Sequence, residues 1–254
     1  MSGHVAEHLG ADVSLSPNFG PRANGQRPNM IVLHYTGMVS AQDAEERLCN
    51  PASEVSAHYL VREDGRVVQM VREADRAWHA GKSSWKGVTD INSCSLGIEI
   101  VNPGHDLGYP DFPEAQMEAV IDLCCGIRAR LGVPAERVLA HSDVAPGRKV
   151  DPGEKFDWKR LAAQGLGVYV DPVPLKGGPG LDPGDAGVKV QEFQSMLAIF
   201  GYGVEITGKY DDQTQTVVGA FQRHFRPARI DGRADVSTRR TLLNLLEKVG
   251  DSGF

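Results

Sequence analysis

The sequence has no apolar run that approaches the roughly 18–20 residues needed to span a membrane. Its first residues also lack the basic and apolar segments that make up a secretory signal peptide. Positive charge is not in excess, because 27 Lys and Arg stand against 33 Asp and Glu among 254 residues. A nucleic-acid partner needs a basic face that neutralises phosphates, so the formal net charge of −6 argues against one. We expect no membrane span and a cytoplasmic location, or the periplasm and cell envelope if a signal has been removed.

Cysteine is scarce, and its four copies form no recognisable pattern. Cys49, Cys94, Cys124 and Cys125 include no CxxC pair, which argues against a disulfide framework and against a thiolate metal site. Cys124 and Cys125 are adjacent within a helical pattern and cannot easily bond to each other. We expect reduced, buried cysteines that behave as small apolar side chains.

Proline and glycine are concentrated in one stretch, residues 171–187, where they supply nine of 17 positions. Such a stretch cannot hold a regular element and is typical of a linker. It divides the chain into a first domain, residues 1–170, and a smaller module, residues 188–254.

The first domain alternates short apolar runs with helical patterns. Residues 114–132 predict a helix that ends at Gly132, and a shorter helix is expected over 41–48. The combination predicts an α/β fold with a mixed central sheet flanked by helices, in a strand order that the sequence leaves open. Runs rich in Val, Ile and Leu predict the strands over residues 30–35, 58–61, 66–70, 96–101 and 138–141.

The module contains an internal duplication. Residues 206–214 and 230–238 share Ile, Gly, a basic residue, Asp and Thr at a spacing of 24. Asp211 and Asp235 each stand just before a helical pattern, which predicts that they are N-caps. With a further helix expected over 188–202, the module is predicted to be a small three-helix bundle. A bundle of this size has little room for catalysis, which favours a binding role.

His141 ends one β-type run and His34 lies near the end of another, where a side chain can project into a cleft. Ten residues after His141, Asp151 precedes a Pro-Gly pair that would fix the backbone beside it. Two imidazoles and a carboxylate with a fourth position left to water form a catalytic zinc arrangement. From spacing alone, a solitary histidine is more often a structural residue than a ligand.

Two further residues suit the chemistry of a metal hydrolase. Glu99 lies between Ile98 and Ile100 in a predicted strand, so it faces away from both and can point to a wet face or to a site. There it could take a proton from the attacking water and deliver one to the leaving amine. Lys149 could stabilise the oxyanion that develops on the attacked carbonyl. Each residue, taken alone, can equally be a solvated surface charge.

The first domain resembles the zinc-dependent N-acetylmuramoyl-L-alanine amidases of the amidase-2 group, which are related to peptidoglycan recognition proteins. The resemblance implies one Zn²⁺ per chain, held by His34, His141 and Asp151. It also places the catalytic glutamate at Glu99 and the family's lysine at Lys149. The matching stretches follow the family's order over most of residues 28–160 and read IVLHYTG, SAHYLVREDGRVVQMV, RAWHAGKSSWKG, NSCSLGIEIVN and HSDVAPGRKVDPG.

Four more residues are candidates for substrate binding. The resemblance places His79 of the AWHAG stretch near the cleft, although it can also be a structural histidine. Tyr35 and Trp85 can line the peptide groove or belong to the core. Asn102, just after the Glu99 strand, is a candidate for contact with the peptide.

The module resembles the peptidoglycan-binding-1 module through FQSMLAIFGY, TGKYDDQT, AFQRHF and IDG. Together the resemblances imply hydrolysis of the amide between the lactyl group of N-acetylmuramic acid and L-alanine, in cell-wall turnover or recycling. The expected partner is peptidoglycan or a muropeptide, and we expect a monomer.

Two alternatives stay open. A non-catalytic peptidoglycan-recognition protein of the same fold typically lacks a complete ligand set, so the intact set argues against it. A recycling amidase that acts on 1,6-anhydro-muropeptides in the cytoplasm fits the missing signal peptide, whereas a wall-binding module favours polymer outside the membrane.

Overall fold

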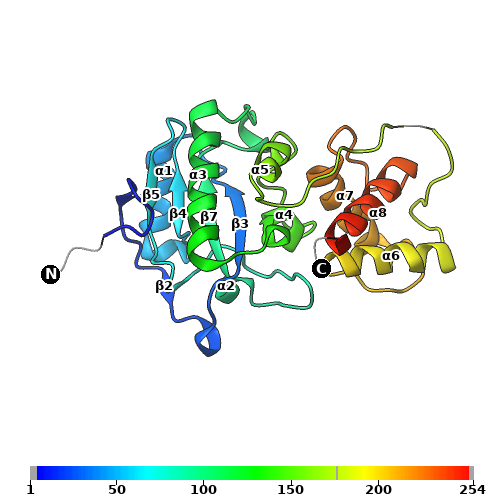
Figure 1. The fold of residues 1–254 in the computed structure, drawn as a ribbon, viewed down its shortest axis with the longest axis horizontal. Coiled ribbons are helices and arrows are strands. Elements are labelled where there is room, and N and C mark those ends of the chain that lie inside the picture. Colours follow the sequence, from blue (N-terminus) through cyan, green and yellow to red (C-terminus); the bar gives the residue numbers. More distant parts are fainter. Residues whose placement is uncertain (1–4, 176, 252–254) are drawn as a thin grey trace.

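The computed structural model describes residues 5–175 and 177–251. A six-stranded mixed sheet forms the centre of the first domain, with helices packed on it (Figure 1). Its strand order is β1-β5-β4-β7-β3-β8. Strands β2 and β6 form a separate two-stranded sheet. The strands are β1 (Asp12–Val13), β2 (Phe19–Gly20), β3 (Met30–Tyr35), β4 (Tyr59–Val61), β5 (Val67–Gln69), β6 (Arg76–Ala77), β7 (Ser95–Ile100) and β8 (Val138–Ala140).

The helices are divided between the two parts of the chain. Those of the first domain are α1 (Ala41–Cys49), α2 (Ile91–Cys94), α3 (Glu114–Leu131), α4 (His141–Val144) and α5 (Trp158–Ala163). The C-terminal module contains α6 (Val188–Phe200), α7 (Asp212–Phe225) and α8 (Val236–Asp251). In Figure 1, α4 and α5 lie between the sheet and the module.

Strand β3 is central and parallel to both of its neighbours, β7 and β8. A parallel strand buried on both faces needs a continuous apolar run, which explains MIVLHY. Because side chains alternate, Ile31 and Leu33 pack into the core that contains α3, while Met30 and Val32 join a second core on the opposite face. His34 continues this second face at the carboxyl end of the strand. Opposite it in register on β7 lies Glu99.

Helix α3 covers the sheet on the face of Ile31 and Leu33. Its buried side chains recur at helical spacing, as the sequence predicts. It ends at Gly132, whose φ of 67° is a left-handed conformation that favours glycine, and whose amide donates to the carbonyl of Arg128 over 2.8 Å.

Strand β8 is shorter than predicted. It ends at Ala140, and His141 is the first residue of helix α4 rather than the last residue of the strand. The physical reason is Asp143, whose Oδ2 accepts a hydrogen bond from the Ala140 amide over 2.9 Å and so caps the helix start. His141 is therefore held by a capped helical turn.

The duplication in the module is visible in its hydrogen bonds. Asp211 Oδ1 accepts from the Thr214 amide over 2.9 Å, and Asp235 Oδ1 accepts from the Thr238 amide over 2.7 Å. Both predicted N-caps are confirmed. The repeat also reaches the preceding helices, because the side-chain amides of Gln194 and Gln222 donate to equivalent loop carbonyls.

The module is packed against the first domain. One apolar core includes Val32 and Val144 from the first domain together with Leu197 and Phe221 from the module. The buried carboxylate of Asp143 in α4 accepts hydrogen bonds from module side chains. The link is thus more than the stretch of chain that joins the two parts.

The expectations about membrane spans and about cysteines can be compared with the fold. Within residues 5–175 and 177–251, no helix combines the length and the apolar character that crossing a membrane requires. All four cysteines are free; Cys94 and Cys124 are buried as expected, whereas Cys49 and Cys125 are partly exposed.

Candidate active site

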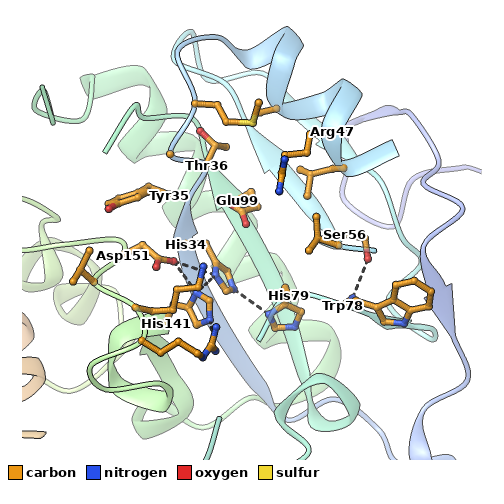
Figure 2. A pocket seen from close by; sticks show the side chains of 18 of the residues that line it. His34, Tyr35, Thr36, Arg47, Ser56, Trp78, His79, Glu99, His141 and Asp151 are labelled. Carbon is orange, nitrogen blue, oxygen red and sulfur yellow. Dashed lines mark hydrogen bonds and ion pairs between the residues drawn. The ribbon is translucent and has the colours of Figure 1, made fainter. Parts of the chain in front are cut away.

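A cavity of about 500 Å³ opens at the carboxyl ends of β3 and β7 (Figure 2). Helix α1, the segment around Ser56 and the segment 148–151 form much of its wall. Seven of the predicted site residues line it, drawn from five separate stretches of sequence. They are His34, Tyr35, His79, Glu99, His141, Lys149 and Asp151.

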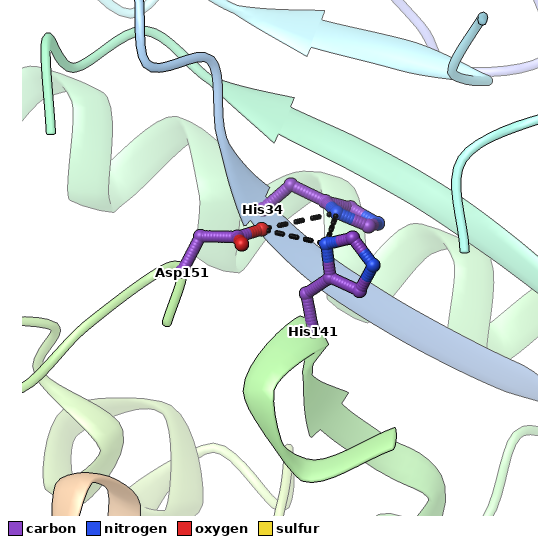
Figure 3. A group of neighbouring side chains, drawn as sticks. All are labelled: His34, His141 and Asp151. Carbon is purple, nitrogen blue, oxygen red and sulfur yellow. Dashed lines mark hydrogen bonds and ion pairs between the residues drawn. The ribbon is translucent and has the colours of Figure 1, made fainter. Parts of the chain in front are cut away.

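The three predicted ligands converge on one point (Figure 3). Asp151 Oδ2 lies 2.9 Å from His141 Nδ1 and 3.2 Å from His34 Nδ1, and the two nitrogens are 2.8 Å apart. All three side chains are buried. They come from β3, from α4 and from the loop after α4, so only the folded chain brings them together.

The donor set of this group suits a cation. Nδ1 is the nitrogen of both histidines that faces Asp151, and a buried carboxylate has to be paired with positive charge. The other nitrogen of His141, Nε2, lies 3.2 Å from the carbonyl oxygen of Ala80 and 3.3 Å from Arg148 Nη2. The set of two imidazoles and one carboxylate therefore fits Zn²⁺, with a fourth position toward the cavity.

Electrostatics also prepare the ligands for a metal. Burial, and then the neighbouring His141, lowers the pKa of His34 to about 4, so His34 is neutral near pH 7. Burial alone raises the pKa of Asp151, but His141 and His34 outweigh it and hold the pKa below its usual value. A neutral imidazole and an ionised carboxylate are the forms that bind a metal.

Glu99 has the environment of an acid–base group. Its Oε2 is buried and has no hydrogen-bond partner among the described residues. Burial raises the pKa of Glu99 well above its usual value, and the charge of Asp151 raises it further, while Lys149 acts in the opposite direction. A carboxyl group with a raised pKa can both hold and release a proton near neutral pH.

The loop that carries Asp151 is fixed from both sides. The Ser142 amide donates to the carbonyl of Asp151 over 3.0 Å, which ties the loop to α4. The Tyr109 hydroxyl donates to the carbonyl of Pro152 over 2.8 Å. A Cβ at Gly153 would lie 2.2 Å from that hydroxyl, so the close approach requires glycine. The peptide between Asp151 and Pro152 is cis.

Two of the predicted substrate-binding residues, Trp85 and Asn102, are not among the described residues that line the cavity. Trp85 is 1% exposed and packs edge-on against Phe200 and Tyr202 of the module, so it belongs to the core, the second of its two interpretations. Asn102 is buried, and its side chain donates to Pro110 and accepts from the Gly104 amide. It shapes the loop after β7, and its contact with the peptide stays a prediction.

Several lining residues were not singled out from the sequence. Arg47 of α1 also lines the cavity (Figure 2). Arg148 donates to the carbonyl of Lys82 over 3.0 Å and closes the side next to His141. Arg148 directly precedes Lys149 in the HSDVAPGRKVDPG stretch, so its place in the sequence could have indicated that it lies near the site. Arg47 could not be found without knowing that α1 packs beside the end of β7.

Three side chains that could hold a metal ion converge in a cavity, beside a carboxyl group with a raised pKa and a lysine. This is the arrangement of a metal-dependent hydrolase. Residues 24–154 match the family described as N-acetylmuramoyl-L-alanine amidase, and residues 186–242 match one described as a putative peptidoglycan binding domain. N-acetylmuramoyl-L-alanine amidase AmiD of Escherichia coli (strain K12) is 37% identical over 237 residues, which are 88% of this chain and 84% of AmiD. The chain belongs to the N-acetylmuramoyl-L-alanine amidase family.

Solved structures agree with this assignment. AmiD of Escherichia coli in complex with the substrate anhydro-N-acetylmuramic acid-L-Ala-D-gamma-Glu-L-Lys matches with a TM-score of 0.76 at 35% identity, over 90% of this chain and 92% of AmiD. AmpDh3 of Pseudomonas aeruginosa in complex with anhydromuramic pentapeptide matches with a TM-score of 0.73 at 30% identity, over 89% of this chain and 94% of AmpDh3. The predicted fold class and the predicted amidase activity are confirmed.

Proposed function

We propose that this amidase uses one Zn²⁺, held by His34, His141 and Asp151, to cleave the amide between the lactyl group of N-acetylmuramic acid and L-alanine. The convergence of the three ligand atoms beside the unpaired Glu99 carboxyl carries the proposal. When bound there, Zn²⁺ would polarise the lactyl carbonyl and lower the pKa of a coordinated water to about 7.

The protein supplies the proton transfers and the charge stabilisation. Glu99 takes a proton from the attacking water and returns it to the nitrogen of L-alanine as the C–N bond breaks. Lys149 stabilises the negative charge that develops on the carbonyl oxygen of the lactyl group. Both line the same cavity, which supports these roles.

The substrate class we propose is a muropeptide with a 1,6-anhydro end. Both solved relatives described above hold an anhydromuramic peptide. Mass spectrometry of products tests the reaction and the substrate together. The zinc-loaded full chain should release anhydro-N-acetylmuramic acid and a peptide with a free L-alanine amine. The Asp151→Asn variant, which lacks one ligand charge, should not. Equal turnover by both proteins would contradict the proposal, and release of peptide from sacculi alone would contradict the substrate class.

We also propose that the module binds peptidoglycan. Its match to a putative peptidoglycan binding domain supports this, and a groove between α6 and α8, lined by Lys189 and Arg240, is available. The full chain with Glu99→Gln should sediment with sacculi without digesting them. Adding Lys189→Ala and Arg240→Ala should weaken this sedimentation. Unchanged sedimentation would remove the groove from wall binding.

Location, assembly and domain limits remain predictions. The cytoplasmic location is tested by fractionation of native cells, and the monomer by light scattering. Limited proteolysis tests the predicted division into residues 1–170, 171–187 and 188–254, since a linker is cleaved before the folded parts on each side.

A further inference from the structure

A chain of three hydrogen bonds runs behind the metal-binding face of His34. His34 Nε2 lies 3.0 Å from His79 Nδ1, and His79 Nε2 lies 3.1 Å from Ser95 Oγ. The Ser95 hydroxyl lies 2.6 Å from the carbonyl oxygen of Ile91. Every side chain in the chain is buried. It joins the end of β3 to the backbone of α2, and Figure 2 shows His79 directed at His34 from the side opposite Asp151.

The direction of each hydrogen bond follows from the last one in the chain, between Ser95 and Ile91. A carbonyl oxygen can only accept, so the single proton of the Ser95 hydroxyl points to Ile91. The lone pair of Ser95 Oγ must then accept from His79 Nε2–H. That leaves His79 Nδ1 unprotonated, and it accepts from His34 Nε2–H. His34 Nδ1 is consequently unprotonated and presents its lone pair to the ligand group.

The ring of His79 is fixed independently of this chain. The backbone amides of His79 and Ala80 both donate to Asn92 Oδ1, over 3.1 and 2.8 Å. The ring lies on Gly97 of β7, where a Cβ would come within 2.3 Å of His79 Cγ. It also meets the ring of His58 edge-on, with 5.8 Å between centroids. An acceptor held this firmly can set both the tautomer and the plane of the imidazole that it binds.

We propose that His79 is a positioning residue of the metal centre: it accepts the Nε2 proton of His34 and thereby directs His34 Nδ1 at the metal. Both ring nitrogens of His79 are engaged within the protein, so no polar atom of the ring is left for the substrate. The role deepens the proposed zinc-dependent function and rests on it. It replaces direct substrate contact as the reason for a histidine at this position.

Two substitutions of nearly equal size separate this role from simple packing. His79→Asn places an amide oxygen near the position of Nδ1 and keeps an acceptor, whereas His79→Leu removes it. Competition with a chromogenic chelator should show that His79→Leu weakens Zn²⁺ binding by about tenfold to a hundredfold, the usual loss for such outer partners. His79→Asn should stay within about threefold of the parent, on the same reasoning. Circular dichroism checks that both variants are folded.

The tautomers provide a readout that does not depend on activity. Long-range ¹H–¹⁵N correlation spectra of the zinc-loaded protein should show protons on Nε2, and not on Nδ1, of both His34 and His79. A proton on His79 Nδ1 would overturn the inference. So would a His79→Leu variant that binds Zn²⁺ as tightly as the parent, or one that changes only KM. If the parent itself binds no Zn²⁺, the proposed metal centre fails instead.

Discussion

The Tyr202 hydroxyl of the module donates a 2.7 Å hydrogen bond to Asp143 Oδ1, two residues after the proposed metal ligand His141. His224, also from the module, donates through Nδ1 to the other carboxylate oxygen over 2.7 Å. Asp143 has no exposed surface and caps the start of α4. The module thus hydrogen-bonds both oxygens of the carboxylate that orders the turn carrying a proposed metal ligand.

Loss of the Tyr202 hydroxyl should destabilise the fold. Tyr202→Phe leaves one oxygen of a buried carboxylate without its donor, so the free energy of unfolding should fall by about 1.5–3 kcal/mol. Tyr210→Phe is the matched control, because its hydroxyl donates over the same 2.7 Å to the neutral carbonyl of Gly232. That loss should be about 0.5–1.5 kcal/mol. Urea denaturation measures both, and equal losses would show that the hydrogen bond to Asp143 contributes no more than one to a neutral carbonyl.

Glu99→Gln should abolish catalysis but preserve the metal. The amide cannot exchange the proton, so kcat/KM on a muropeptide should fall at least about a hundredfold, the scale of a positioned acid–base group. Zinc content by atomic emission should stay at one per chain, because Glu99 is not among the converging ligands. Glu63→Gln, at an exposed position, is the control and should be fully active. A Glu99→Gln enzyme with near-parental turnover would remove Glu99 from the mechanism.

Gly201 should tolerate no side chain. A Cβ there would lie 2.4 Å from Cε2 of Trp85, and its φ of 145° is unusual for other residues. Because Trp85 is enclosed in the core between domain and module, it cannot move aside, and Gly201→Ala should destabilise by more than about 1–3 kcal/mol. Gly219→Ala, in α7 with open space around it, should stabilise by up to about 1 kcal/mol. Thermal unfolding of both variants tests this contrast.

Acid should destabilise the metal-free fold partly through His58. Burial, and then the charge of Arg22, lowers the pKa of His58 to about 3, and its Nδ1 accepts from the Gly97 amide. Between that pKa and the ordinary value of about 6.5, the unfolded chain binds a proton that the folded chain does not. Stability from this source is present above about pH 6.5 and declines by about 1.4 kcal/mol per unit as pH falls.

The matched variant for this pH effect is His58→Asn, which keeps an acceptor near Nδ1 but does not titrate. Its free energy of unfolding should depend less steeply on pH between about 6 and 4 than that of the parent. Urea titrations at half-unit steps give both slopes. Parallel slopes would show that His58 keeps its ordinary pKa in the fold.

Local patterns were enough to predict much of the fold. The apolar run of β3, the periodicity and terminal glycine of α3, and the N-caps Asp211 and Asp235 each depend on neighbours in sequence. The order of the strands depends instead on which buried faces meet across the chain, and no local pattern records that. His141 was misplaced by one element because the cap that ends β8 comes from a side chain three residues farther on.

The docking of the module could not be predicted for a similar reason. A Pro- and Gly-rich stretch indicates a linker, but it says nothing of the surfaces on either side. The sequence left Trp85 open between the groove and the core and did not single out Asp143. Their packing against Phe200, Tyr202 and His224 of the module is seen only in the fold. The ligands, by contrast, were predicted through the family resemblance, because spacing alone left solitary histidines open to a structural reading.

Gly97 has no side chain, and the ring of His79 packs directly on its backbone. Any side chain introduced there would meet the imidazole that steadies His34. Engineers who seek a more heat-tolerant enzyme by filling the interior must therefore leave this strand untouched. Helix positions remote from the cleft, such as Gly219, offer the safer route to a sturdier catalyst.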